Sequence, residues 1–258
     1  PLASSSTLGV SQGAAFGAAF AIIVLGAGMQ SQTLDGVTFS DPYAISLCAF
    51  AGSMMSTVVI LGMSRVKRIT PEMMVLAGVA LSSVFSGGTT LLQYFADDVK
   101  VAAVVFWTFG NLGSTSWREI IIMAAVVAAS LIYFMFNRWN YNALQNGENT
   151  AKGLGVNVES MRIIGMIVCS LTASVIVSYI GIINFIGLIS PHLMRRVIGS
   201  DYRYLLPASA MGGAILLLLS DTVARLAVQP VVLPIGAITS FLGAPLFMYL
   251  IFKGGKRR

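Results

Sequence analysis

Long apolar runs separated by short polar connections make up most of this chain. A membrane-spanning helix needs about 20 mostly apolar residues, and eight runs approach or reach that length. They lie at about 7–27, 43–63, 72–95, 117–136, 161–182, 185–198, 205–228 and 235–252. The pattern predicts an all-α fold, a polytopic membrane helical bundle with about eight transmembrane helices.

The sixth run, 185–198, is too short to cross a bilayer by itself. It carries Gly187 and Pro191 and ends in Arg195 and Arg196. We expect a broken or partial helix here, packed inside the bundle, because irregular backbone is not tolerated against lipid.

Composition supports a membrane protein. The chain has 258 residues, of which 56% are hydrophobic and only 10% are charged, whereas a soluble domain carries about 25% charged residues. The net charge of +6 comes from short basic clusters between apolar runs, so it fits membrane topology better than nucleic-acid binding. Cys48 and Cys169 lie inside apolar runs without CxxC spacing, which predicts neither a disulfide nor a zinc site.

Lysine and arginine set the predicted orientation. If the first run leads outward from the cytoplasm, thirteen basic residues fall on the cytoplasmic side and three on the external side, a strong positive-inside bias. The C-terminus is then cytoplasmic. The cytoplasmic residues are Arg65, Lys67, Arg68, Arg138, Lys152, Arg162, Arg195, Arg196, Arg203, Lys253, Lys256, Arg257 and Arg258, and the external ones are Lys100, Arg118 and Arg225.

Two connections are long enough to fold. Residues 96–117 are apolar but too short for a span with loops, and we expect a short external helix that plugs the mouth of the bundle. The polar cytoplasmic segment 137–162 contains Asn149 and Thr150, either of which can cap a short helix that stops at Gly153 or Gly155. This segment is either a docking site for a soluble partner or a plain loop.

The chain resembles the FecCD permeases, the transmembrane subunits of type II ABC importers that carry iron–siderophore complexes, haem, vitamin B12 and, in some members, molybdate. Matching segments follow in the family's order over the whole chain. They are PLASSSTLGVSQGAAFG, LAGVALSSVFSG, VFWTFGNLGSTSW, GENTAKGLGVNV, INFIGLISPHLMRRVIGSDYRYLLP, SDTVARL and VVLPIGAITSFLGAPLFMYLI.

The resemblance implies a single permease domain over 1–258 in the cell (inner) membrane, as a fragment that lacks the first two of the family's ten helices. It also implies a homodimer around one pathway, two cytoplasmic ABC ATPase subunits, and an extracytoplasmic solute-binding protein that delivers the ligand. No cofactor and no metal site are implied. The chain has no Walker A pattern, so ATP hydrolysis must come from the separate ATPase, and we do not expect an enzyme.

The family's motifs also assign site residues. The coupling loop, about 137–162, matches the ATPase-coupling residues Gly147, Glu148, Thr150, Ala151, Lys152, Leu154 and Gly155. Arg225, and with weaker support Arg118, match binding-protein docking, although Arg225 can instead pair with Asp221 four residues away. The pathway-lining candidates are Ser82, Ser83, Ser86, Thr89 and Thr90, some of which will bond to their own helix.

His192 is the only histidine in the chain. A metal site would need further ligands, and a proton relay would need ionisable neighbours within the spans. The family pattern favours a structural role, in which Pro191 breaks the helix and His192 satisfies freed carbonyls or a neighbouring loop.

We therefore expect the permease subunit of an ATP-driven importer for metal chelates, with iron–siderophore as the first candidate. Haem, vitamin B12 and molybdate remain alternatives within the same class. An ion-coupled secondary transporter would require acidic residues in mid-span. An intramembrane enzyme would require a nucleophile–base or metal constellation. Neither pattern is found in the sequence.

Overall fold

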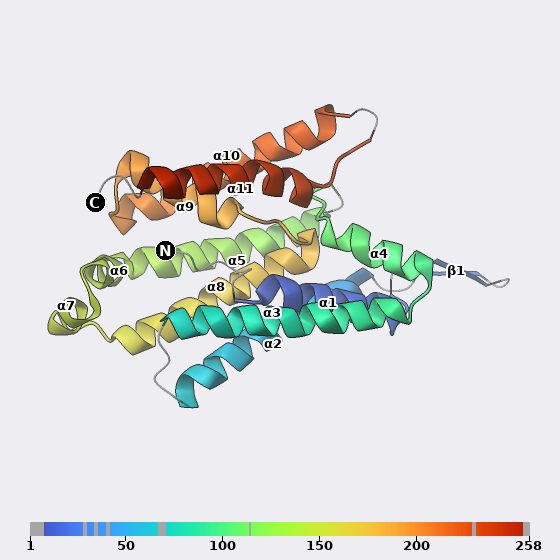
Figure 1. The fold of residues 1–258 in the computed structure, drawn as a ribbon, viewed down its shortest axis with the longest axis horizontal. Helices are drawn as coiled ribbons and strands as arrows, with labels where there is room; N and C mark the ends of the chain where they lie inside the picture. Colours follow the sequence, from blue (N-terminus) through green and yellow to red (C-terminus); the bar gives the residue numbers. More distant parts are fainter. Residues whose placement is uncertain are drawn as a thin grey trace. The chain divides into compact units, whose positions relative to one another are not determined.

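A computed structural model describes residues 8–27, 30–33, 36–39, 42–66, 71–113, 115–228 and 231–254. Within these residues the chain forms eleven helices and one two-stranded antiparallel hairpin (Figure 1). The elements are α1 (Val10–Ile23), β1 (Gln30–Thr33), β2 (Gly36–Phe39), α2 (Pro42–Val66), α3 (Pro71–Tyr94), α4 (Asp98–Thr108), α5 (Trp117–Phe136), α6 (Arg138–Gln145), α7 (Glu148–Gly153), α8 (Val158–Ile180), α9 (Ile186–Ile198), α10 (Tyr202–Leu226) and α11 (Ile235–Gly254).

The predicted all-α class is confirmed, with the hairpin β1–β2 as the addition. Five helices among the described residues are long and apolar enough to cross a membrane: α2, α3, α5, α8 and α10. The first run is shorter than expected, because α1 starts only after Gly9, whose φ of 74° is left-handed, and has 14 residues. The segment 96–117 was expected to contain a short helix, and it forms α4.

The chain divides into two compact units. The first contains the described residues up to Glu119 together with Ser170–Ile182, and the second contains Ile120–Cys169 and the residues from Ile183 onward. The long helix α8 therefore contributes to both units.

In the first unit α1 packs against α2, α3 and α4, and Figure 1 shows α1, α2 and α3 running side by side. Glycines bring the backbones of α1 and α2 into direct contact. A Cβ on Gly13 would clash with the carbonyl oxygen of Gly52, and a Cβ on Gly17 with that of Cys48. Small residues at four-residue spacing allow helices to approach this closely in lipid, where packing replaces the hydrophobic effect between helices.

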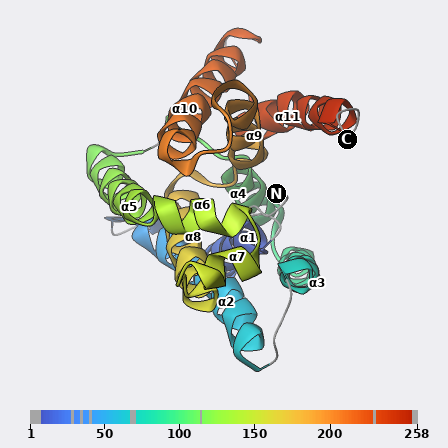
Figure 2. The same cartoon turned by 90° about the vertical axis from the view of Figure 1, so that its left-hand side faces the viewer.

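In the second unit α9 packs against α10 and α11, as Figure 2 shows. The Ser190 hydroxyl on α9 donates to the Ser209 carbonyl on α10 at 2.5 Å. On the other side of α9, a Cβ on Gly243 of α11 would meet the Phe185 side chain at 2.5 Å. Small residues thus set the spacing of these three helices.

The partial helix expected at 185–198 is confirmed, but the expected break at Pro191 is wrong. Helix α9 continues through Pro191 from Ile186 to Ile198. A proline removes one intrahelical hydrogen bond, and the packing of α9 on two neighbouring helices holds the remaining turns in place. The unusual backbone lies instead at the N-cap, Phe185, with φ 66°.

We predict that Gly17→Ala lowers the free energy of unfolding by about 1–3 kcal/mol, the usual cost of overpacking a close contact. Gly62→Ala on α2 is the matched control, because a Cβ there meets nothing within 4 Å and alanine stabilises a helix by about 0.5–1 kcal/mol over glycine. Thermal unfolding in detergent would measure both variants. Equal melting temperatures for Gly17→Ala and Gly62→Ala would contradict the close contact between α1 and α2 at Gly17.

Candidate coupling and transport sites

The predicted coupling loop folds into two short helices, α6 and α7, joined by a sharp turn at Gly147. Gly147 has φ 106° and ψ 151°, a backbone conformation that is essentially restricted to glycine, and it is the N-cap of α7. The expected cap at Asn149 or Thr150 is therefore wrong, since both residues lie inside the helix. Gly147 has no side chain that could cap the helix, and the backbone turn itself starts α7.

The end of α7 at Gly153 agrees with the prediction, and two backbone hydrogen bonds define the conformation of this C-terminus. Gly155 follows with φ 81°. The Gly155 N–H donates to the Lys152 carbonyl and the Val156 N–H to the Ala151 carbonyl, both at 3.0 Å. This is a Schellman motif, which satisfies the last carbonyls of a helix. Its glycine is required by the positive φ.

The side chains of α7 divide into anchors and an exposed surface. Ala151 is fully buried. Glu148, at the start of the helix, forms an ion pair with Arg162 in the first turns of α8. Leu154 directly follows the helix and is 68% exposed although it lies outside the spans.

Helix α6 is fastened to the turn between α9 and α10. The Asn142 side chain donates from Nδ2 to Asp201 Oδ1 at 2.7 Å and accepts from the Tyr202 N–H at 2.9 Å. Gln145 Nε2 donates to the Ser200 carbonyl at 2.8 Å. We call these three hydrogen bonds the α6–α10 junction.

Sequence reasoning missed this junction. Asp201 caps α10 by accepting from the Arg203 N–H at 2.9 Å, and an Asp just before a helix is a readable N-cap signal. The hydrogen bond from Arg203, followed by that from Asn142, holds the pKa of the Asp201 carboxyl below its ordinary value. An aspartate is ionised at neutral pH even at its ordinary pKa, so the shift extends this range toward lower pH and the carboxylate can only accept hydrogen bonds.

The five candidate pathway residues all lie on α3, and four of them bond back to their own helix. Ser83, Ser86 and Thr90 are exposed, whereas Ser82 and Thr89 are partly buried. The back-bonds expected for some of these side chains are confirmed. They run from Ser82 to Gly78, from Ser83 to Val79, from Thr89 to Phe85 and from Thr90 to Ser86, each to a carbonyl at 2.8–3.1 Å.

The two candidate docking arginines differ in their surroundings. Arg225 Nε donates to Asp221 Oδ2 at 2.8 Å in the last turns of α10, so the internal ion pair considered from the sequence is formed. Its side chain is still 50% exposed. Arg118 is exposed in the first turn of α5.

The start of α5 carries a signal that sequence reasoning overlooked. The Ser116 N–H donates to Glu119 Oε2 at 2.8 Å, and the Glu119 N–H donates to Ser116 Oγ at 3.4 Å. This reciprocal arrangement is a capping box, and the sequence SWRE fits its S-x-x-E pattern.

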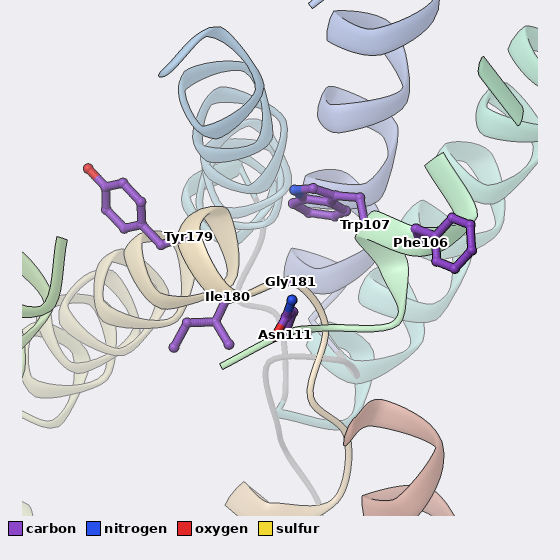
Figure 3. A pocket seen from close by; sticks show the side chains of 6 residues that line it. All are labelled: Phe106, Trp107, Asn111, Tyr179, Ile180 and Gly181. Atoms are coloured by element: carbon purple, nitrogen blue, oxygen red, sulfur yellow. The ribbon is translucent and has the colours of Figure 1, made fainter. Parts of the chain in front are cut away.

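A cavity of about 210 Å³ lies in the first unit, between the C-terminal ends of α4 and α8 (Figure 3). The Asn111 N–H donates to the Ile180 carbonyl at 2.8 Å and closes one wall. Gly181, with φ 82°, passes so close to α4 that a Cβ would meet the Trp107 carbonyl at 2.6 Å. The lining residues are Phe106, Trp107, Asn111, Tyr179, Ile180 and Gly181, a mostly apolar set.

His192 is the residue considered above as a metal ligand, a proton relay or a structural group. No group of three or more His, Cys, Asp or Glu side chains that could hold an ion occurs in the described part of the chain. The imidazole is half-buried and makes no hydrogen bond to any described residue, so the expected bonds to carbonyls are not observed there.

We predict that Gly155→Ala speeds amide exchange in α7 by about 5- to 30-fold, because a left-handed φ costs a non-glycine residue about 1–2 kcal/mol. Gly153→Ala is the matched control, two residues away, with helical φ and open space for a Cβ. It should slow exchange instead. Hydrogen exchange followed by mass spectrometry reports both, and equal rates in the two variants would refute the role of Gly155.

Comparisons of this chain with protein families, sequences and solved structures found matches over nearly its whole length. The model of the FecCD transport family matches residues 1–253. The ABC transporter permease protein MJ0087 of Methanocaldococcus jannaschii is 56% identical over 257 residues, which cover 100% of this chain and 73% of that protein. The hemin transport system permease HmuU of Yersinia pestis is 33% identical, over 100% of this chain and 75% of that protein.

Two further relatives agree. The vitamin B12 import system permease BtuC of Salmonella newport is 36% identical, over 99% of this chain and 74% of that protein. A solved structure described as an inward-facing, metal-chelate-type ABC transporter superposes with a TM-score of 0.86 and 29% identity, over 98% of this chain and 77% of that one. The chain therefore belongs to the FecCD transport family and is a multi-pass membrane permease of the type II ABC importer class.

Proposed function

We propose that this chain forms the pathway of an ATP-driven importer for metal chelates, with a ferric siderophore as the first candidate substrate. The relatives named for hemin and vitamin B12 both handle a metal held in a large organic ligand. The hydroxyls on α3 support such a pathway, because a bulky chelate needs a passage without strong binding groups. Haem, cobalamin and molybdate are the competing cargoes.

The observation that carries this proposal is the exposed helix α7, which lies between two glycines of positive φ. Gly147 and Gly155 fix both ends of the helix, Glu148 is paired, and Leu154 is free to enter a cleft on a partner. A rigid element can transmit closure of an ATPase, whereas a mobile loop would absorb it. We assign Gly147, Glu148, Thr150, Ala151, Lys152, Leu154 and Gly155 to this contact.

The assembly that follows has two copies of the chain around one pathway, two ATPase subunits on the side of α7, and a solute-binding protein on the opposite side. The positive-inside bias supports a cytoplasmic location for α7 and for the C-terminus, in a cell membrane. Arg225 and Arg118 fall on the external side in this orientation.

Vesicle uptake tests the proposal. The complete permease, reconstituted with its ATPase and binding protein, is supplied with labelled ferric siderophore, haem, cobalamin or molybdate, with and without ATP. Uptake of the siderophore that requires ATP supports the proposal, and ATP-dependent uptake of another cargo replaces the substrate only. Uptake that ignores ATP and follows a proton or sodium gradient would overturn it.

We predict that Leu154→Asp weakens ATPase binding by at least about tenfold, since it places a charge where an exposed apolar side chain enters a partner, and interface anchors typically contribute 2 kcal/mol or more. Leu154→Met is the control and should retain binding, because it preserves the apolar contact. Co-purification and titration of the ATPase onto permease in nanodiscs measure the effect. If the Leu154→Asp permease bound the ATPase with unchanged affinity, Leu154 would not be part of the ATPase contact.

We also predict that Arg225→Glu weakens docking of the binding protein by about tenfold or more at low salt, and by less at high salt, where charges are screened. Asp221→Asn is the discriminating control. It breaks the internal pair but leaves the arginine charge for the partner, so docking should persist or strengthen. Equal loss in both variants would show that the pair acts only within α10.

A further inference from the structure

Helix α10 joins two regions that the proposed function separates across the membrane. Its N-terminal end, at Asp201, lies in the α6–α10 junction, next to the coupling helix α7. Its last turn carries Arg225, the candidate docking residue. Both ends belong to the same compact unit, so the path between them stays within one packed set of helices.

The α6–α10 junction fixes the orientation of α6 as well as its position. The Asn142 amide bonds with both its donor and its acceptor side, to the Asp201 side chain and to the Tyr202 backbone N–H. Gln145, one turn further along, holds the Ser200 carbonyl. Two polar side chains on one face of α6 therefore form hydrogen bonds with three consecutive residues, 200–202, at the start of α10. These bonds oppose both translation of α6 along its axis and rotation about it.

The segment between the junction and α7 is very short. Gln145 is the last residue of α6, and α7 begins at Glu148, with the Gly147 N–H bonded to the Leu144 carbonyl. A displacement of α7 must therefore either strain this turn or carry α6 and the α9–α10 turn with it.

Beyond the junction, α10 is a single helix of 25 residues, about 37 Å long at 1.5 Å per residue. Pro207 removes one hydrogen bond near its start, and the bond from Ser190 on α9 to the Ser209 carbonyl braces the helix directly after it. A movement imposed at Asp201 is therefore passed along the axis of α10.

We propose that Asn142 is a positioning residue that links the two sides of the transporter: the α6–α10 junction transmits movement of α7 to α10, and so couples ATPase engagement to docking of the binding protein at Arg225. This inference rests on the proposed function. Coupling of two binding events is reciprocal, so the bound nucleotide should change the affinity for the binding protein, and the binding protein should change the affinity for nucleotide by the same factor. We also expect the binding protein to stimulate ATP hydrolysis through the same junction.

The test uses the assembled permease and ATPase in nanodiscs with purified binding protein. For Asn142→Ala we expect stimulation of ATP hydrolysis by the binding protein to fall about fivefold or more, the lower range of allosteric coupling. Basal hydrolysis, ATPase co-purification and docking affinity without nucleotide should stay unchanged. Asn146→Ala, which alters only a bond to the Asn142 carbonyl within α6, should leave stimulation intact.

A conservative variant separates the junction from a general loss of structure. Asn142→Asp opposes the Asp201 carboxylate and should abolish stimulation, whereas Asp201→Asn keeps an Oδ1 that accepts from both Asn142 and the Arg203 N–H and should retain it. Full stimulation in Asn142→Ala, or loss of stimulation in Asp201→Asn, would overturn the inference. Neither result affects the proposed function, which fails only if the unaltered complex shows no ATP-dependent uptake.

Discussion

The absence of water from a bilayer core governs this structure more than any single contact. Each backbone N–H and C=O within the spans must find its partner inside the protein, so the membrane part consists of helices. The same demand explains the serine and threonine hydroxyls of α3, which bond to carbonyls of the preceding turn. The glycines between α1 and α2 have a different cause: lipid provides no hydrophobic force between helices, so close packing of two backbones without intervening side chains holds them together.

Outside the spans the constraint relaxes, and specific turns replace continuous helices. Gly147 and Gly155 adopt backbone angles that other residues avoid, and they enclose a six-residue helix that would not persist as an isolated peptide. Its stability comes from the Schellman motif, from the pairing of Glu148 with Arg162, and from buried Ala151. Contacts at both ends of α7 and one buried side chain therefore hold this conformation.

The sequence was informative where one dominant physical rule applies. Run length and apolarity predicted the five long helices, and glycine predicted the end of α7. Local rules failed where the conformation depended on packing or on a turn. Helix α9 continues through Pro191 because α10 and α11 support it. Helix α7 begins at a glycine turn and not at an Asn or Thr cap. The bond between Asn142 and Asp201 joins residues 59 positions apart, and no local pattern reveals it.

The back-bonded hydroxyls of α3 have a consequence for selectivity along the proposed pathway. A hydroxyl that has given its proton to a carbonyl can only accept, and weakly, so it offers a passing cargo little chemistry to recognise. A pathway lined by such groups can be hydrated, but it discriminates between substrates by size and not by specific hydrogen bonds. A pathway of this kind would pass any substrate of suitable size that the solute-binding protein releases into it. A new solute-binding protein could then extend the range of imported substrates without any change in the membrane subunit.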